Sequence, residues 1–95
     1  MNYDENIIKE VESLAGLFLT PEEISVLLDI DRTEFDRQIR MKSGILYKTY
    51  MFGKTQSKKE IHVNVIKMAK HGSPLAEDMA QKMIISQDSY ERSIK

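Results

Sequence analysis

The stretch LTPEEISVLLDIDRTEF, residues 19–35, constrains the fold more than any other part of the chain. Thr20 is a favourable N-cap, Pro21 suits the first position of a helix, and Glu23 follows the cap by three residues. Together they form the pattern of a capping box, in which cap and glutamate satisfy each other's backbone N–H groups. The pattern predicts a helix that begins at Pro21. The residues expected to face the core from this helix are Ile24, Leu27 and Leu28.

A second helix start follows almost at once. Asp31 can cap it, and Glu34 stands in the reciprocal position of a second capping box. Asp29 and Ile30 then form the turn between the two helices. We expect the side chain of Ile30 to pack into the core, and Asp29 tolerates a left-handed backbone better than most residues. Two short helices joined by so tight a turn have the layout of a helix-turn-helix.

The remainder of the chain also favours helices. It has only four Gly and two Pro, and the first apolar stripe, within residues 4–15, follows helical spacing. A helix is expected at 57–71, and another at 74–86 after the cap Ser73. Residues 44–53 could form a short strand, but no partner strand is evident and we expect helix there. The side chains expected to face inward from the last helix are Leu75, Met79, Met83 and Ile84.

These patterns predict an all-α fold with three parts. A three-helix helix-turn-helix head, residues 1–42, is followed by a helical hairpin, residues 43–88, which packs on the head or oligomerises. Residues 89–95 form a polar tail that we expect to be flexible. Ninety-five residues suffice for one modest core.

Charge is distributed unevenly along the chain. Residues 1–30 carry one Lys against seven acids, and residues 31–72 carry ten Lys or Arg against four acids. Residues 73–95 are close to balance, with three bases and four acids. A basic middle in a nearly neutral chain indicates a one-sided contact with nucleic acid, although ordinary solvated helix faces would give the same counts.

No pattern predicts catalysis, a bound metal or a cofactor. Cysteine is absent, and His62 and His71 lack neighbouring carboxylates. Gly53-Lys54-Thr55 matches only the end of a phosphate-binding loop. No secretory signal and no apolar run of membrane-spanning length is visible, which predicts a cytoplasmic protein.

Helical geometry identifies the side of the second helix-turn-helix element that should face DNA. With Phe35 and Ile39 pointing into the core, Arg37 points outward, because successive residues are 100° apart. Arginine pairs with guanine edges and glutamine with adenine. An alternative is a surface ion pair between Asp36 and Arg40. The expected contacts to double-stranded DNA from this helix are Thr33, Arg37, Gln38 and Arg40.

Lysines after this helix could grip backbone phosphates, or could simply belong to solvated surfaces. These candidates are Lys42, Lys48, Lys54, Lys58 and Lys59.

Two segments together carry a resemblance to a known family. GLFLTPEEISVLLDIDRTEFDRQI, followed by Tyr50-x-x-Gly53-Lys54, a lysine-rich helix and MAKHGSPLAEDMAQKMI, resembles the small terminase subunit of tailed bacteriophages over residues 8–85. The resemblance implies a non-catalytic component that recognises DNA for packaging, forms a homo-oligomeric ring and recruits a large terminase ATPase-nuclease. It also implies a phage or prophage protein in the cytoplasm of a bacterial host. Here Asp29 stands where the family often has Gly.

Two other functions fit the same patterns. An oligomeric adaptor or scaffold could use this fold for protein contacts, as the acidic first thirty residues and the many apolar side chains suggest. A helix-turn-helix transcriptional regulator would share the DNA-binding head.

Overall fold

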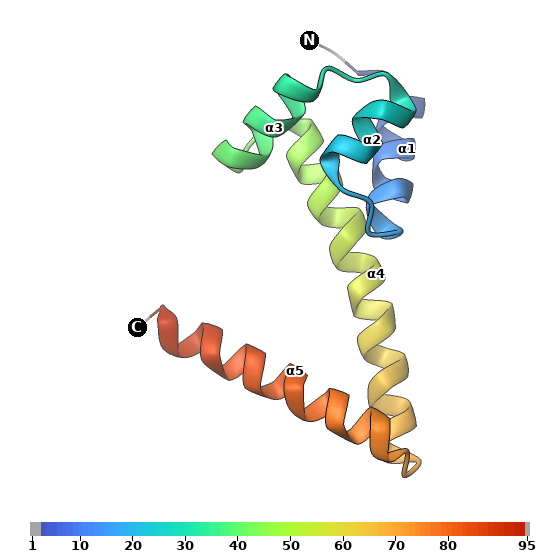
Figure 1. Cartoon of the computed structure of the whole chain (residues 1–95), viewed down its shortest axis with the longest axis vertical. Helices are drawn as coiled ribbons and strands as arrows, with labels where there is room; N and C mark the ends of the chain where they lie inside the picture. The colour runs from blue at the N-terminus through green and yellow to red at the C-terminus, as the bar shows by residue number, and fades with distance from the viewer. Residues whose placement is uncertain (1–2, 95) are drawn as a thin grey trace. The chain divides into compact units, whose positions relative to one another are not determined.

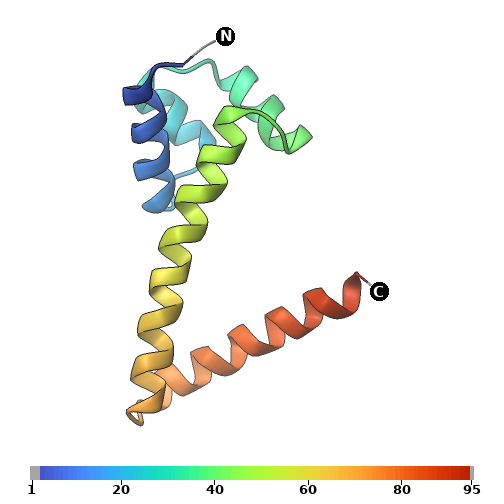
Figure 2. The ribbon, with the colours of Figure 1, turned by 180° about the vertical axis from the view of Figure 1, so that it is seen from behind.

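Five helices and no strand lie between Tyr3 and Ile94, the residues that the computed structural model describes. They are α1 (Glu5–Gly16), α2 (Pro21–Leu28), α3 (Arg32–Met41), α4 (Ile45–Lys70) and α5 (Pro74–Ser93), as Figures 1 and 2 show from opposite sides. The predicted all-α class is confirmed. Within residues 3–94, every helix is too short or too polar to traverse a bilayer. Residues 1, 2 and 95 of the expected head and tail lie outside the described residues.

The predicted N-caps of α2 and α3 form. The Thr20 hydroxyl accepts a hydrogen bond from the backbone N–H of Glu23 (3.2 Å), and the Glu23 carboxylate accepts one from the backbone N–H of Thr20 (2.9 Å). At α3, Asp31 accepts a hydrogen bond from the backbone N–H of Thr33 (2.9 Å). Each bond satisfies an N–H group that the first turn of a helix otherwise leaves without a partner.

The turn between α2 and α3 also has the predicted geometry. Asp29 adopts a left-handed conformation with φ 55°, and Ile30 is buried. The expectation for Leu27 was wrong, because its side chain is 61% exposed. Leu27 follows Ile24 by three residues, but the fully buried face of α2 centres on Ile24 and Ser25.

Residues 45–53 of the segment expected at 44–53 are helical, and they continue without a break into the segment expected at 57–71, as one helix that ends at Lys70. Gly44, with φ 98°, precedes the helix. Gly53 lies in the middle of this single helix, where a β-carbon would overlap the carbonyl group of Glu12 in α1. Gly16 of α1 lies beside Ser57 of α4 where the two helices cross. A β-carbon added to Gly16 would lie 2.8 Å from the hydroxyl oxygen of Ser57. Gly53 therefore does not end α4; it lets α1 approach the α4 backbone.

The last helix is longer than expected. α5 ends at Ser93 rather than near Ser86, so residues 89–93 of the expected tail are helical. Neither Gly nor Pro occurs between Leu75 and Ile94 to end the helix earlier.

Contacts between residues divide the chain into two compact units, Met1–Lys58 and Lys59–Lys95, called the N-terminal unit and the C-terminal unit below. The first half of α4 therefore belongs with α1, α2 and α3 (Figure 1). The expected division into head, hairpin and tail concerns which parts of the chain fold and act independently. That division stays a prediction. α2 packs against both α1 and α3. The buried core of the N-terminal unit consists of Val11, Ala15, Ile24, Ile30, Phe35 and Leu46.

The C-terminal unit buries much less apolar surface. Among its described residues, Val65 and Ala76 are the buried apolar side chains. Leu75, Met79 and Ile84, expected to face inward, are exposed. That expectation was wrong because this unit contains only the end of α4 and α5, and two helices cannot surround each other's apolar faces.

Candidate nucleic-acid interface

The orientation of α3 follows from its anchor residue. Phe35 is fully buried and meets the ring of Tyr50 in a T-shaped contact, with centroids 6.0 Å apart and ring planes at 87°. Ile39, one turn later, packs against the same core. The opposite side of α3 is therefore the exposed one, and Thr33, Arg37 and Arg40 lie there as the helical geometry predicted.

Gln38 lies on the inner side of α3 instead of the expected DNA-facing side. It is buried, and its Oε1 accepts hydrogen bonds from the backbone N–H groups of Leu46 (2.9 Å) and Tyr47 (3.4 Å). Its Nε2 donates to Glu34 (3.0 Å). Gln38 thus caps the first turn of α4 and positions that helix against α3. The spacing of three residues from Phe35 places Gln38 on the flank of the buried face, and the start of α4 beside it makes the difference between burial and exposure.

Arg37 is exposed, but its charge is paired. Its Nε donates to Glu34 Oε2 (3.0 Å), and its Nη2 donates to Glu34 Oε1, which makes a two-pronged ion pair. Its Nη1 also lies 3.5 Å from the sulfur of Met41. The hydrogen bonds from Arg37 and then from Gln38 lower the pKa of Glu34 to about 2, and the same pair raises the pKa of Arg37.

The pairing also corrects the second capping box. Glu34 was expected to accept a hydrogen bond from the backbone N–H of Asp31. Its carboxylate instead binds Arg37 and Gln38, which lie one turn further along α3. Two charged or polar donors on its own helix outcompete the single backbone N–H at the helix start.

Three cationic side chains without an ion-pair partner lie at the end of α3 and the start of α4. Arg40, Lys42 and Lys48 are exposed, and none of the ion pairs formed within residues 3–94 includes them. The expected alternative, an ion pair between Asp36 and Arg40, does not form; Asp36 pairs with Arg32 at 3.4 Å. These three cations are close in sequence across the short link between the two helices.

The other candidate lysines lie further along α4. Lys54 is half-buried, and its ammonium group lies over the ring of Tyr50, 5.7 Å from the centroid. This cation–π contact ties Lys54 to the residue that packs against Phe35. Lys58 and Lys59 are exposed, and the boundary between the two units falls between them.

The acidic residues around α2 and α3 have roles within their own chain. Glu23 and Asp31 cap helices, Asp29 makes the left-handed turn, and Glu22 pairs with Arg32 at 3.0 Å. Their presence near a candidate DNA surface therefore has a structural explanation. The clustered acids do not by themselves argue for a basic ligand or a metal.

A feature that the sequence patterns missed is a shallow apolar hollow on the outer side of α2. Leu19, Glu22, Glu23, Val26 and Leu27 line it. Val26 is 77% exposed, so its apolar side chain contributes nothing to the core. The signal was present, because the run Ile24 to Leu28 holds more apolar residues than one helix face can bury.

Comparison of the chain with protein-family models, with curated proteins and with solved structures gave no match.

Proposed function

We propose that this protein is a non-catalytic double-stranded DNA-binding protein in which α2 and α3 act as a helix-turn-helix. The observation that carries the proposal is the exposed, unpaired cationic group of Arg40, Lys42 and Lys48 beside a helix anchored by Phe35. Such cations bind phosphates, and anchored recognition helices of this kind enter the major groove. Thr33 and Arg37 lie on the same exposed side of α3 and would face the bases.

The residues of this surface would have different tasks. Lys42 and Lys48 would bind backbone phosphates and fix the position of the protein on the duplex, and Arg40 would bind a phosphate or a guanine edge. Arg37 is held by Glu34, which presents its guanidinium in one orientation and also offsets its charge. Gln38 would act indirectly, by holding the start of α4 and hence Lys48 in place.

The resemblance to small terminase subunits supports a specific biological role for the proposed DNA-binding protein. On that reading the protein recognises DNA for packaging in the cytoplasm of an infected bacterium and recruits a large ATPase-nuclease. The adjacent helix-turn-helix and basic segment support this reading, and a transcriptional regulator is the alternative within the same class.

A fluorescence-anisotropy titration with a labelled duplex at several salt concentrations tests the proposal. The test variant combines Arg40→Ala, Lys42→Asn and Lys48→Ala; Asn is chosen because Lys42 has φ 53° and Asn tolerates that conformation. Removing three phosphate contacts should weaken binding at low salt and flatten the slope of log K against log salt by about 0.9 per lost contact. Lys9→Ala, which removes an exposed charge from α1, is the matched control and should change neither quantity.

The adaptor reading makes the opposite prediction. It is favoured by the exposed apolar side chains and by the neutralisation of Arg37 by Glu34. If a folded sample binds no duplex at low salt, the DNA-binding proposal is wrong and the adaptor reading takes its place.

A further inference from the structure

A continuous set of hydrogen bonds joins the exposed side of α3 to the buried start of α4. The backbone N–H of Leu46 donates to Gln38 Oε1 (2.9 Å), and Gln38 Nε2 donates to Glu34 Oε1 (3.0 Å). The Glu34 carboxylate then accepts from Nε and Nη2 of Arg37. Gln38, at the inner end, is 7% exposed, whereas the side chain of Arg37, at the outer end, is 51% exposed. We call these three side chains the Gln38–Glu34–Arg37 network.

The inner end of the network is fixed by its surroundings. The Gln38 amide has one favourable orientation, because Oε1 faces two backbone N–H donors and Nε2 faces a carboxylate. Gly44 leaves room for it. A β-carbon added at Gly44 would overlap the Gln38 side chain. The carboxylate of Glu34 is therefore held from inside the N-terminal unit as well as by Arg37.

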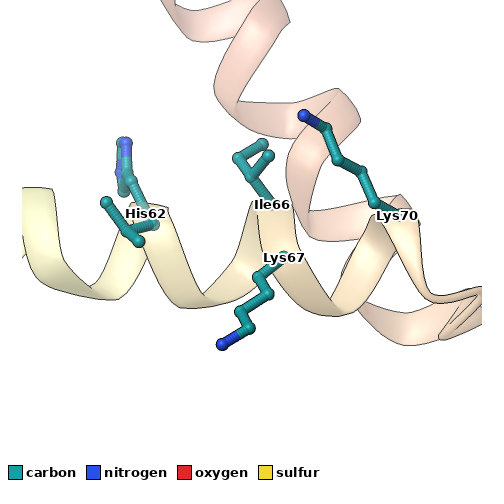
Figure 3. A pocket seen from close by; sticks show the side chains of 5 residues that line it. His62, Ile66, Lys67 and Lys70 are labelled. Atoms are coloured by element: carbon teal, nitrogen blue, oxygen red, sulfur yellow. The ribbon is translucent and has the colours of Figure 1, made fainter.

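Cations elsewhere on the surface are not ordered in this way. In the shallow hollow at the end of α4, Lys67 projects away from Ile66 and Lys70 (Figure 3). Neither lysine belongs to an ion pair formed within residues 3–94. Arg37 differs from them because its guanidinium is held in one direction by two parallel hydrogen bonds.

Arg37 still has donors to offer to a ligand. A guanidinium carries five N–H bonds in a rigid plane. Glu34 takes the Nε bond and one bond of Nη2, which lie along one edge of that plane. The next edge is formed by Nη1 and Nη2, and the group beside it is the sulfur of Met41, 3.5 Å from Nη1 and only a weak acceptor. Arg37 can therefore donate a second pair of parallel hydrogen bonds.

Two acceptors in DNA fit such an edge, namely a phosphate and the O6 and N7 atoms of guanine. The charge of Glu34 distinguishes them. Hydrogen bonds from Arg37 and Gln38 lower the pKa of Glu34 to about 2, so its carboxylate is ionised at neutral pH and repels a phosphate approaching the same guanidinium. The edge of guanine has no net charge and is repelled much less.

We propose that the Gln38–Glu34–Arg37 network recognises the guanine of a G·C base pair in the major groove. Arg37 contacts O6 and N7, and Glu34 is the positioning residue that fixes the direction of the guanidinium. The inference rests on the proposed function and adds to it a base preference with a named origin. The three cations at the link between α3 and α4 supply affinity through phosphates, and the network supplies discrimination between bases.

Selection from a pool of duplexes with a randomised central segment, followed by sequencing, identifies the preferred duplex. Fluorescence anisotropy then compares this duplex with one in which a selected guanine is replaced by 7-deazaguanine, which lacks the N7 acceptor but keeps the base pair and every phosphate. At one such position the unaltered chain should bind the substituted duplex about fivefold or more weakly. Arg37→Lys keeps the charge without the planar fork, and should bind the two duplexes equally well.

Glu34→Gln tests the positioning role. It removes the charge and one prong of the pair with Arg37, so affinity for both duplexes should rise while the ratio between them falls close to one. The matched control is Asp36→Asn, which removes another α3 carboxylate that is paired with an arginine, Arg32. This control should also raise affinity but keep the ratio of the unaltered chain. Circular dichroism checks that each variant remains helical.

Three results would overturn the inference. One is an unaltered chain that binds every duplex of the pool equally well, and another is a ratio that Arg37→Lys or Glu34→Gln leaves unchanged. The third is a phosphate contact, in which Arg37→Ala weakens binding to both duplexes equally and flattens the salt slope by about 0.9. In all three the chain still binds duplexes, so the proposed function stands. A folded chain that binds no duplex at low salt refutes both proposals.

Discussion

The two compact units contain similar helices but very different interiors. In the N-terminal unit, residues from all of α1, α2, α3 and the first half of α4 meet in one buried cluster around Phe35 and Ile24. In the C-terminal unit, the described residues bury only Val65 and Ala76 among their apolar side chains. This difference shows that helix caps and helix-forming residues do not by themselves produce a buried core. Good caps and helix-forming residues produce α5, but its apolar residues lack a neighbour to cover them.

The largest expected difference between the units is in the effect of removing an apolar side chain. Phe35→Ala should lower the free energy of unfolding by about 3–5 kcal/mol, because it empties a fully buried site and removes the contact with Tyr50. Ile85→Ala, at a site that is 61% exposed, should change it by less than about 0.5 kcal/mol. Urea denaturation followed by circular dichroism measures both. Similar losses in the two variants would mean that α5 is buried in solution.

The crossing of α1 and α4 gives the next largest effect. Gly→Ala inside a helix normally stabilises it by about 1 kcal/mol. At Gly53 the sign should reverse, with a net loss of about 2 kcal/mol or more, because the new methyl group would meet the backbone of Glu12. Gly16→Ala should cost less, since it meets the side chain of Ser57, which can rotate away. Thermal unfolding of both variants checks the order; a stabilised Gly53→Ala would show that the crossing is looser than described.

Replacement of the buried cap should have an intermediate effect. Gln38→Ala removes the acceptor for the N–H groups of Leu46 and Tyr47 and should cost about 1–2 kcal/mol. At a temperature where the Gln38→Ala variant is fully folded, its affinity for a duplex should fall far less than the affinity of the Arg40→Ala variant. A large loss of DNA affinity without loss of stability would return Gln38 to the DNA-contacting set.

The smallest expected effect concerns pH. The pKa of Glu34 is lowered from 4.5 to about 2 in the folded chain, so its contribution to stability is present above pH 4.5 and is lost as pH falls toward 2. Between about pH 6 and about pH 3, the urea midpoint of the unaltered chain should fall further than that of Glu34→Gln. Equal falls would indicate that the ion pair with Arg37 does not persist in solution.

The Glu34→Gln variant also releases Arg37 and removes an acid, so its affinity for a duplex should rise.

Local patterns predicted the parts of the fold that depend on neighbouring residues. The caps at Thr20 and Asp31, the left-handed turn at Asp29 and the outward direction of Arg37 and Arg40 all follow from spacing along the chain. The segment 44–53 was expected to be helical because no partner strand was evident, and it is helical from Ile45 onward.

The features that were missed depend on contacts between distant residues. The role of Gly53 requires knowing that α1 crosses α4 there, and the burial of Gln38 requires knowing that α4 begins beside it. The exposure of Leu75 could not be predicted either, because helical periodicity identifies an apolar face without showing whether anything covers it. For the candidate site, the pairing of Glu34 with Arg37 rather than with a backbone N–H was a choice between two local partners that spacing alone leaves open.

The most direct test of the DNA-binding account is an NMR titration of the ¹⁵N-labelled chain with a short duplex at low salt. The account predicts that the amide signals of Thr33, of residues 40–42 and of Lys48 shift progressively, and that raising the salt reverses the shifts. Signals that do not move at any duplex concentration, or shifts confined to residues 59–94, would contradict it.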